Sequence, residues 1–211
     1  LNFSNSYVEG SDKTAFKSVR AIRNFGNWIM GCMDESACNY NPDANMADDS
    51  CEYAQVGYDC EGNITEYIVG MEAEGGIVFY VDETGEHGLV AAMEDLEEKY
   101  SWGCHGTSLS GADESSIGTG YQNTLDILEG CSETPIAASE ASAFESQGYT
   151  DWYLPSKDEL LEMYYTIGLG GPEGNIGGFA NTCEDCWDTW YWSSSEENGS
   201  DAWDKDFSGG S

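Results

Sequence analysis

The chain has 211 residues, of which 40 are acidic and only seven are lysine or arginine, so its formal net charge is −33 at pH 7. This charge excludes nucleic acid as a partner, because binding phosphates requires a basic face that displaces counterions. No apolar run approaches the length of a membrane span, so we expect no membrane insertion. Hydrophobic residues make up 40% of the chain, which indicates a protein that folds around a core.

Residues 1–25 differ from the rest of the chain in charge, with a net +2 against −35 for the remainder. Two strand-like runs, 1–7 and 15–22, flank a turn at 9–12, and the second run alternates like a half-buried strand. A lone two-stranded hairpin is barely stable in water, so these strands need a sheet to join. An uneven scatter of few basic residues is the alternative. The residues expected to contact an acidic partner surface are Phe3, Phe16, Lys17, Arg20, Ile22 and Arg23.

Residues 26–65 form an acidic, cysteine-rich spacer with almost no aliphatic side chains. Such a segment cannot build a core, so we expect disulfides, a metal ion or both to hold it. Its four cysteines, Cys32, Cys38, Cys51 and Cys60, allow three pairings, and the sequence does not choose among them.

The spacer also contains a candidate calcium site in a twelve-residue frame. Positions 1, 3, 5, 9 and 12 are Asn41, Asp43, Asn45, Asp49 and Glu52, and the carbonyl of residue 47 takes position 7. This is the ligand spacing of an EF-hand loop, which makes calcium the one cofactor that the sequence suggests. Position six carries a methionine instead of the usual glycine, and flanking helices are not evident. The alternative is a solvated acidic loop.

Residues 66–211 are expected to form the main domain, of α+β class. Runs 76–81 and 88–93 predict a hairpin, and three helical stripes follow it. The first stripe carries Tyr121, Thr124, Leu125 and Leu128; the second carries Ala137, Ala141 and Phe144; the third carries Leu160, Leu161, Tyr164 and Ile167 after a capping box at Ser156 and Glu159. Strand character resumes at 190–192 and 201–207. The last strands of the domain are missing unless residues 1–25 supply them.

Eight cysteines and only two histidines predict four disulfides, and therefore an extracellular or cell-surface protein. Cys104 and Cys131 flank the first predicted helix and are expected to pair. Cys183 and Cys186 fit a small structural disulfide best, with a redox pair and half of a zinc site as alternatives.

Three motifs of the main domain carry a family resemblance: G-I-V-F-Y at 76–80, D-W-Y-L-P-S-K-D-E-L at 151–160 and Y-W-S-S-S-E at 191–196. Together they resemble the C-terminal domain of bacterial collagen-like adhesins. The resemblance implies a fold like that of C-type lectins and of formylglycine-generating enzymes. The spacer in turn resembles acidic G-C-x-D-x-x-A-C-N-Y-N-P-x-A repeats of large secreted bacterial surface proteins.

The order of the motifs is permuted relative to that family. There, an F-S-N-G strand and a closing V-R-A-I-R strand follow the serine-rich strand, but here N-F-S-N and V-R-A-I-R stand at residues 2–5 and 19–23. Residues 1–7 also resemble residues 205–211, at an offset of 204. We therefore expect one period of a tandem array, or a subunit whose N-terminal strands complete its neighbour. A permuted chain that closes on itself, with 26–65 as the bridge, is the alternative.

These features predict a structural repeat unit of an extracellular filament or array, with copies of itself as partners. The alternative function is an adhesin module that binds glycans or a host protein through residues 168–190, although the sugar-binding motifs of C-type lectins are missing. An enzyme is not expected, because Ser193, Ser194 and Ser195 have no histidine nearby. A formylglycine-generating activity would require Cys183 and Cys186 to be free thiols.

Overall fold

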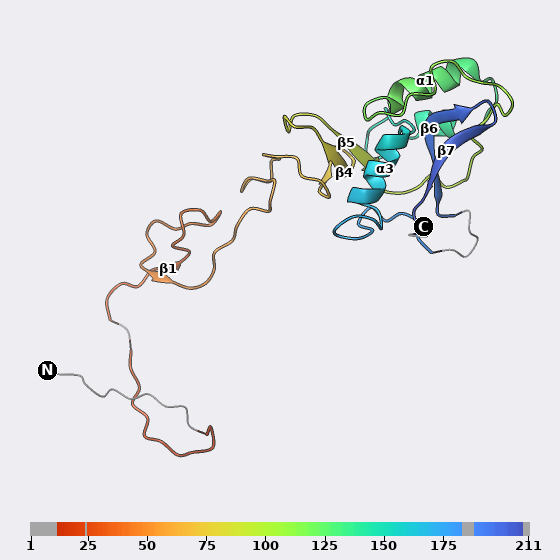
Figure 1. Cartoon of the computed structure of the whole chain (residues 1–211). Coiled ribbons are helices and arrows are strands. Elements are labelled where there is room, and N and C mark those ends of the chain that lie inside the picture. Colours follow the sequence, from red (N-terminus) through yellow and green to blue (C-terminus); the bar gives the residue numbers. More distant parts are fainter. Residues whose placement is uncertain (1–11, 24, 183–187, 209–211) are drawn as a thin grey trace. The chain divides into compact units, whose positions relative to one another are not determined.

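The computed structural model describes residues 12–23, 25–182 and 188–208, and Figure 1 shows its elements. The chain divides into two compact units, Leu1–Gln55 and Val56–Ser211. The N-terminal segment and most of the predicted spacer thus belong to one small unit, and the boundary falls before the expected position at 65/66. In the described part of the chain, no helix has both the length and the apolar character that crossing a bilayer requires.

The small unit is held by side-chain amides and a disulfide instead of a core. Its two short strands, β1 (Met30–Gly31) and β2 (Met46–Ala47), pair in parallel. The side chain of Asn45 accepts a hydrogen bond from the Ile29 amide (3.1 Å) and donates one to the Asn27 carbonyl (3.1 Å). Nearby, Cys32 and Cys51 form a disulfide. The expectation of a disulfide-stapled region is thus confirmed. The Cys32–Cys51 bond excludes the two pairings in which Cys32 joins Cys38 or Cys60.

The large unit has an α+β fold, as expected. An antiparallel sheet contains β3 (Glu72–Ala73), β4 (Gly76–Val81) and β5 (Gly88–Ala92), and a second antiparallel pair contains β6 (Trp190–Asn198) and β7 (Asp201–Asp206). The helices are α1 (Gly120–Gly130), α2 (Ala137–Ala143) and α3 (Lys157–Thr166). Helix α3 lies between the β4–β5 hairpin and the β6–β7 hairpin (Figure 1). The predicted hairpin and both later strands are confirmed.

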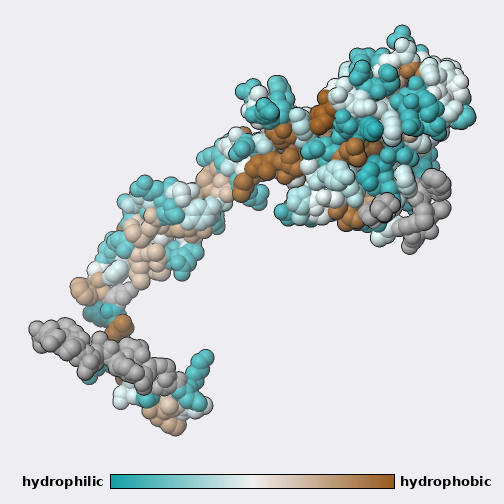
Figure 2. Space-filling view, in the orientation of Figure 1, coloured by the Kyte–Doolittle hydropathy of each residue, from teal (hydrophilic) through white to brown (hydrophobic). Residues whose placement is uncertain are grey.

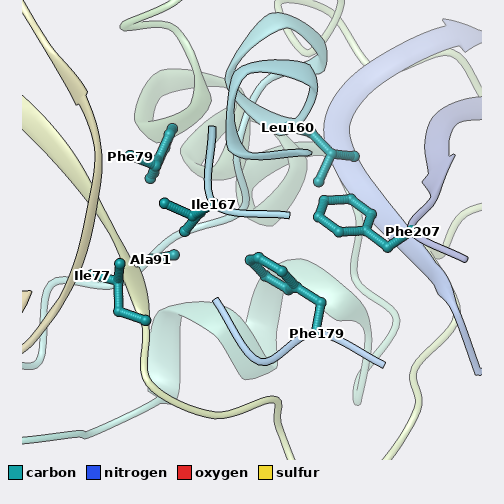
Figure 3. Packing of buried hydrophobic residues seen from close by; sticks show 7 residues of the cluster. All are labelled: Ile77, Phe79, Ala91, Leu160, Ile167, Phe179 and Phe207. Carbon is teal, nitrogen blue, oxygen red and sulfur yellow. The ribbon is translucent and has the colours of Figure 1, made fainter. Parts of the chain in front are cut away.

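An aromatic cluster forms the first core, between α3 and the sheet (Figure 3). Phe207 is fully buried at its centre, with ring centroids 4.6 Å from Phe179, 4.8 Å from Tyr191 and 5.2 Å from Tyr164. Offset and edge-to-face contacts of this kind add about 0.5–1.5 kcal/mol per pair to the burial of the rings. The other buried members are Ile77, Phe79, Ala91, Leu160 and Ile167.

A second core lies on the other side of the β6–β7 hairpin, around α1 and α2. Its buried members are Trp102, Leu109, Ala112, Ile127, Cys131, Ile136 and Ala138. Neighbouring residues of a strand point to opposite faces, so Tyr191 of β6 packs on the first core and Trp192 on the second. The hairpin therefore joins the two cores.

Helix α3 begins as its sequence predicts. The Ser156 hydroxyl accepts a hydrogen bond from the Glu159 amide (3.3 Å), and the Glu159 carboxylate accepts one from the Ser156 amide (2.6 Å). These reciprocal bonds are the predicted capping box, and they satisfy two amides that helix geometry leaves free. On the predicted stripe, Leu160 and Ile167 are buried.

The predicted stripe of α1 is partly wrong. Tyr121 and Leu125 are 53% and 39% exposed, whereas the buried face contains Asn123, Thr124 and Ile127. The physical reason is that this face of the helix packs against a loop whose backbone carbonyl needs a hydrogen-bond donor. Asn123 donates to the Glu114 carbonyl (2.7 Å), so this buried amide is paired. Of the second predicted stripe, Ala137 and Ala141 are buried in α2, whereas Phe144 follows the last residue of the helix and is half-buried.

The predicted strand at 15–22 does not form in the isolated chain: residues 16–23 adopt neither helix nor strand. Strand geometry needs backbone hydrogen bonds from a neighbour, and this segment has none among the described residues. The companion strand at 1–7 lies outside the described residues.

We expect Glu159→Ala to destabilise the large unit by about 2–4 kcal/mol, because the buried Ser156 amide and the Gly118 amide lose their carboxylate acceptor. Besides Ser156, the Gly118 amide donates to this carboxylate (2.6 Å), and Glu159 is 1% exposed. Denaturant unfolding with the disulfides intact measures the change. Glu162→Ala, on the same helix but less buried, is the control, and equal stability of the two variants would contradict this role.

Candidate functional site

The segment of residues 12–25 contains most of the predicted contact residues. It begins with a turn in which the Asp12 carboxylate accepts hydrogen bonds from the Thr14 amide (2.8 Å) and hydroxyl (2.7 Å). These bonds hold the pKa of Asp12 below its usual value. The turn sets the backbone conformation at the start of the segment. Phe3, another predicted contact residue, lies outside the described residues.

The apolar side chains after this turn have no cover in the isolated chain. Phe16, Val19 and Ile22 are 103%, 93% and 94% exposed, and Phe25 is 86% exposed. Single exposed apolar residues are normal on a protein surface, but four large ones among ten consecutive residues are a high local concentration. Such a concentration indicates a binding segment.

Among the described residues, the cations of the segment have no acidic partner. Lys17, Arg20 and Arg23 are exposed. In the described part of the chain the one salt bridge joins Lys99 and Asp188, far along the sequence. The segment therefore presents apolar and positive groups together, whereas the visible face of the large unit is mostly hydrophilic (Figure 2).

The predicted calcium frame is not assembled into a cage of ligands. The Asn41 side-chain oxygen accepts a hydrogen bond from the Asp43 amide (3.1 Å), and the Asn45 side-chain oxygen accepts one from the Ile29 amide. Asp49 and Glu52 are exposed. Calcium binding at these five residues stays a prediction, and it requires the loop to turn its oxygens inward.

The disulfides fit the expected pattern where the structure describes them. Cys104 and Cys131 form a disulfide, as predicted from their positions around α1. Cys38 and Cys60 are also disulfide-bonded. Cys183 and Cys186, and with them the predicted small disulfide and its alternatives, lie outside the described residues.

One cluster has the composition of a metal site, but its chemistry is different. Across the described residues, Cys104, Cys131 and Glu133 are the only group of three or more such side chains with ligand atoms within 4.8 Å. The two sulfurs are oxidised to a disulfide, and a Glu133 oxygen accepts a hydrogen bond from the Cys104 amide (2.9 Å). The cluster therefore anchors a loop to the C-terminal end of α1.

The consecutive serines Ser193, Ser194 and Ser195 of β6 form hydrogen bonds to neighbouring elements of the large unit. Each is fully buried. Ser193 donates to the Trp203 carbonyl (2.8 Å), and Ser195 donates to the Glu114 carbonyl (2.7 Å). The hydroxyl of Ser195 also accepts a hydrogen bond from the Lys157 amide (3.0 Å). A nucleophilic serine needs access and a base, whereas these hydroxyls are engaged with the backbone.

Glu196 is a structural residue that the sequence reasoning missed. The amide of Leu109 donates to both of its carboxylate oxygens (3.1 and 3.2 Å). The residue is 8% exposed and pins the loop before α1 to β6. A signal existed, because the Y-W-S-S-S-E motif ends on this acid shortly after the residues of strand character at 190–192.

The segment 168–190, expected as the loop face of an adhesin, is partly folded inward. Phe179 is buried in the first core, and the Asn175 side chain donates to its carbonyl (2.7 Å). Leu169, Ile176 and Trp190 are 41%, 40% and 43% exposed. Trp187 lies outside the described residues.

Comparison of the chain with protein-family models, with curated proteins and with solved structures gave no match.

We expect Cys104→Ala with Cys131→Ala to lower the unfolding free energy of the large unit by about 2–5 kcal/mol. The bridge spans 27 residues of sequence, and Cys131 is 5% exposed in the second core. Urea unfolding, monitored by tryptophan fluorescence, measures this change in unfolding free energy. The Cys32→Ala, Cys51→Ala pair is the control, because that bridge lies in the small unit; equal losses in the large-unit transition would contradict the assignment.

The calcium prediction gives a defined titration result. Isothermal titration should show one calcium site that is lost in the Asp49→Asn, Glu52→Gln double variant, because both carboxylates are ligands of the predicted frame. Glu97→Gln with Glu98→Gln, an exposed pair in the large unit, removes the same charge and should leave that site intact. A flat titration of the unsubstituted chain would contradict the site.

Proposed function

We propose that the chain is a structural repeat unit of an extracellular filament or tandem surface array of bacterial origin. The N-terminal strands of one unit complete the lectin-like domain of the next, which makes a head-to-tail contact. Such a contact uses two different surfaces of the unit, so it continues into a fibre unless the rotation closes a ring. The full exposure of Phe16, Val19 and Ile22 is the observation that carries this proposal.

Apolar burial alone is not sufficient for this contact. Burying three side chains of this size contributes roughly 5–8 kcal/mol. Association costs an estimated ~4–15 kcal/mol in lost freedom of motion. Backbone hydrogen bonds supply further stabilisation if the segment is added to a sheet as a strand, which also fixes its register.

Open sheet edges are present to receive such a strand. Within the described residues, β5 and β7 each have one edge with no backbone partner. Unpaired edges of this kind are templates for addition of a strand. By contrast, the second edge of β6 is covered, because Ser194 and Glu196 donate to the carbonyls of Pro155 and Ala112.

Charge favours the same contact at physiological salt. The Debye length there is about 8 Å, so repulsion between two acidic units is largely screened while direct ion pairs are not. The positive segment of one unit therefore meets the acidic surface of another without the full cost of bringing two such charges together. The disulfides fit an oxidising extracellular setting.

An adhesin module is the second candidate. It is favoured by the exposed Leu169, Ile176 and Trp190, which offer apolar surface to a glycan or a host protein. This function predicts binding by a monomeric chain, whereas the filament function predicts self-association.

We expect Phe16→Ser with Ile22→Ser to weaken self-association at least about tenfold, because two apolar anchors are lost. Sedimentation velocity and electron microscopy of the full chain measure the change. Val56→Ser removes an apolar side chain that is 83% exposed elsewhere, so it is the matched control. Unchanged assembly of the double variant would refute the role of the segment.

A further inference from the structure

The β4–β5 hairpin has apolar side chains on both of its faces. Ile77 and Ala91 are a cross-strand pair that faces the first core. Val78 and Val90 are the next pair, and therefore point away from that core. This face is already partly covered, because Val78 is 2% exposed and Val90 is half-buried.

A groove follows this outward face of the hairpin. It is lined by Val78, Val81, Leu89 and Val90, with the carboxylates of Glu74 and Glu86 among its other lining groups. Its volume is about 300 Å³, at the small end of ligand sites, so it suits one or two side chains better than a whole organic ligand.

The rim of the groove carries carboxylates, and His87 is also among its lining residues. Glu83 and Glu86 are exposed in the turn of the hairpin, and the sequence contains no lysine or arginine between residues 24 and 98. Glu74 accepts hydrogen bonds from the hydroxyls of Tyr67 and Tyr149, which lower the pKa of Glu74. An apolar floor and an acidic rim match a peptide with alternating apolar and basic residues.

We infer that this groove and the open edge of β5 receive residues 15–23 of a second copy of the chain. Phe16 and Ile22, which point to the same face of an extended strand, supply the apolar side chains, and Lys17, Arg20 and Arg23 reach the carboxylates of Glu74, Glu83 and Glu86. The inference rests on the proposed function and names the acceptor surface within it.

The other open edge, at β7, contains Asp201, Asp204 and Asp206 beside one lysine, so charge does not distinguish it from the edge of β5. The apolar groove beside β5 is the feature that favours the β5 edge.

A charge-reversal experiment on the full chain tests the pairing. One variant reverses the donor (Lys17→Glu, Arg20→Glu, Arg23→Glu), and a second reverses the acceptor (Glu83→Lys, Glu86→Lys). The matched control is Glu97→Lys with Glu98→Lys, which changes the net charge as the acceptor variant does and alters equally exposed residues. Circular dichroism verifies that each variant is folded, and sedimentation velocity measures association.

We expect the donor and acceptor variants each to associate at least about tenfold more weakly than the control, and a mixture of the two to form complexes that neither forms alone. In the mixture, the intact segment of one variant meets the intact groove of the other. If the acceptor variant associates like the control while the donor variant does not, the acceptor is elsewhere and the proposed assembly survives. If the donor variant associates like the unsubstituted chain, the proposed function itself fails.

Discussion

The buried hydrogen-bond network around the first turn of α3 is the constraint on which the large unit depends. Its central group is the Glu159 carboxylate, which accepts hydrogen bonds from the amides of Ser156 and Gly118. Ser195 links the same turn to β6. Because a buried carboxylate without partners is costly, the loop before α1, the helix and the strand must be placed together or not at all. The two apolar cores form on either side of this arrangement.

Nearly all buried polar side-chain atoms of the described residues have a hydrogen-bond partner. Against so well-paired an interior, apolar groups left exposed at the surface point to an interaction. In the described residues one buried side-chain atom, Asn123 Oδ1, lacks a hydrogen-bond partner. A chain that satisfies its polar groups so fully also exposes the large apolar side chains of Phe16, Val19, Ile22 and Phe25, and it has a groove with half-buried apolar lining along the β4–β5 hairpin. The N-terminal segment is positively charged, and the groove on the hairpin has an acidic rim. A single contact between two copies would cover both.

Sequence patterns predicted the elements of the large unit well where local signals are strong. The capping box at Ser156 and Glu159 placed the start of α3, and the buried run 76–81 placed β4. The face of α1 was not predictable, because its burial of Asn123 depends on carbonyl groups that only tertiary structure brings near. The groove beside β5 had no local signal either, since it depends on which side of the hairpin the helix covers. The lectin-like fold, the closing role of residues 1–25 and the calcium site stay predictions.

Hydrogen–deuterium exchange of the full chain at increasing protein concentration tests the central claim most directly. If residues 15–23 add as a strand to a second copy, their amides and those of β5 should become protected together, and only at concentrations where the chain associates. Protection of residues 15–23 that is present at every concentration would contradict the account, because the segment would then be folded onto its own chain.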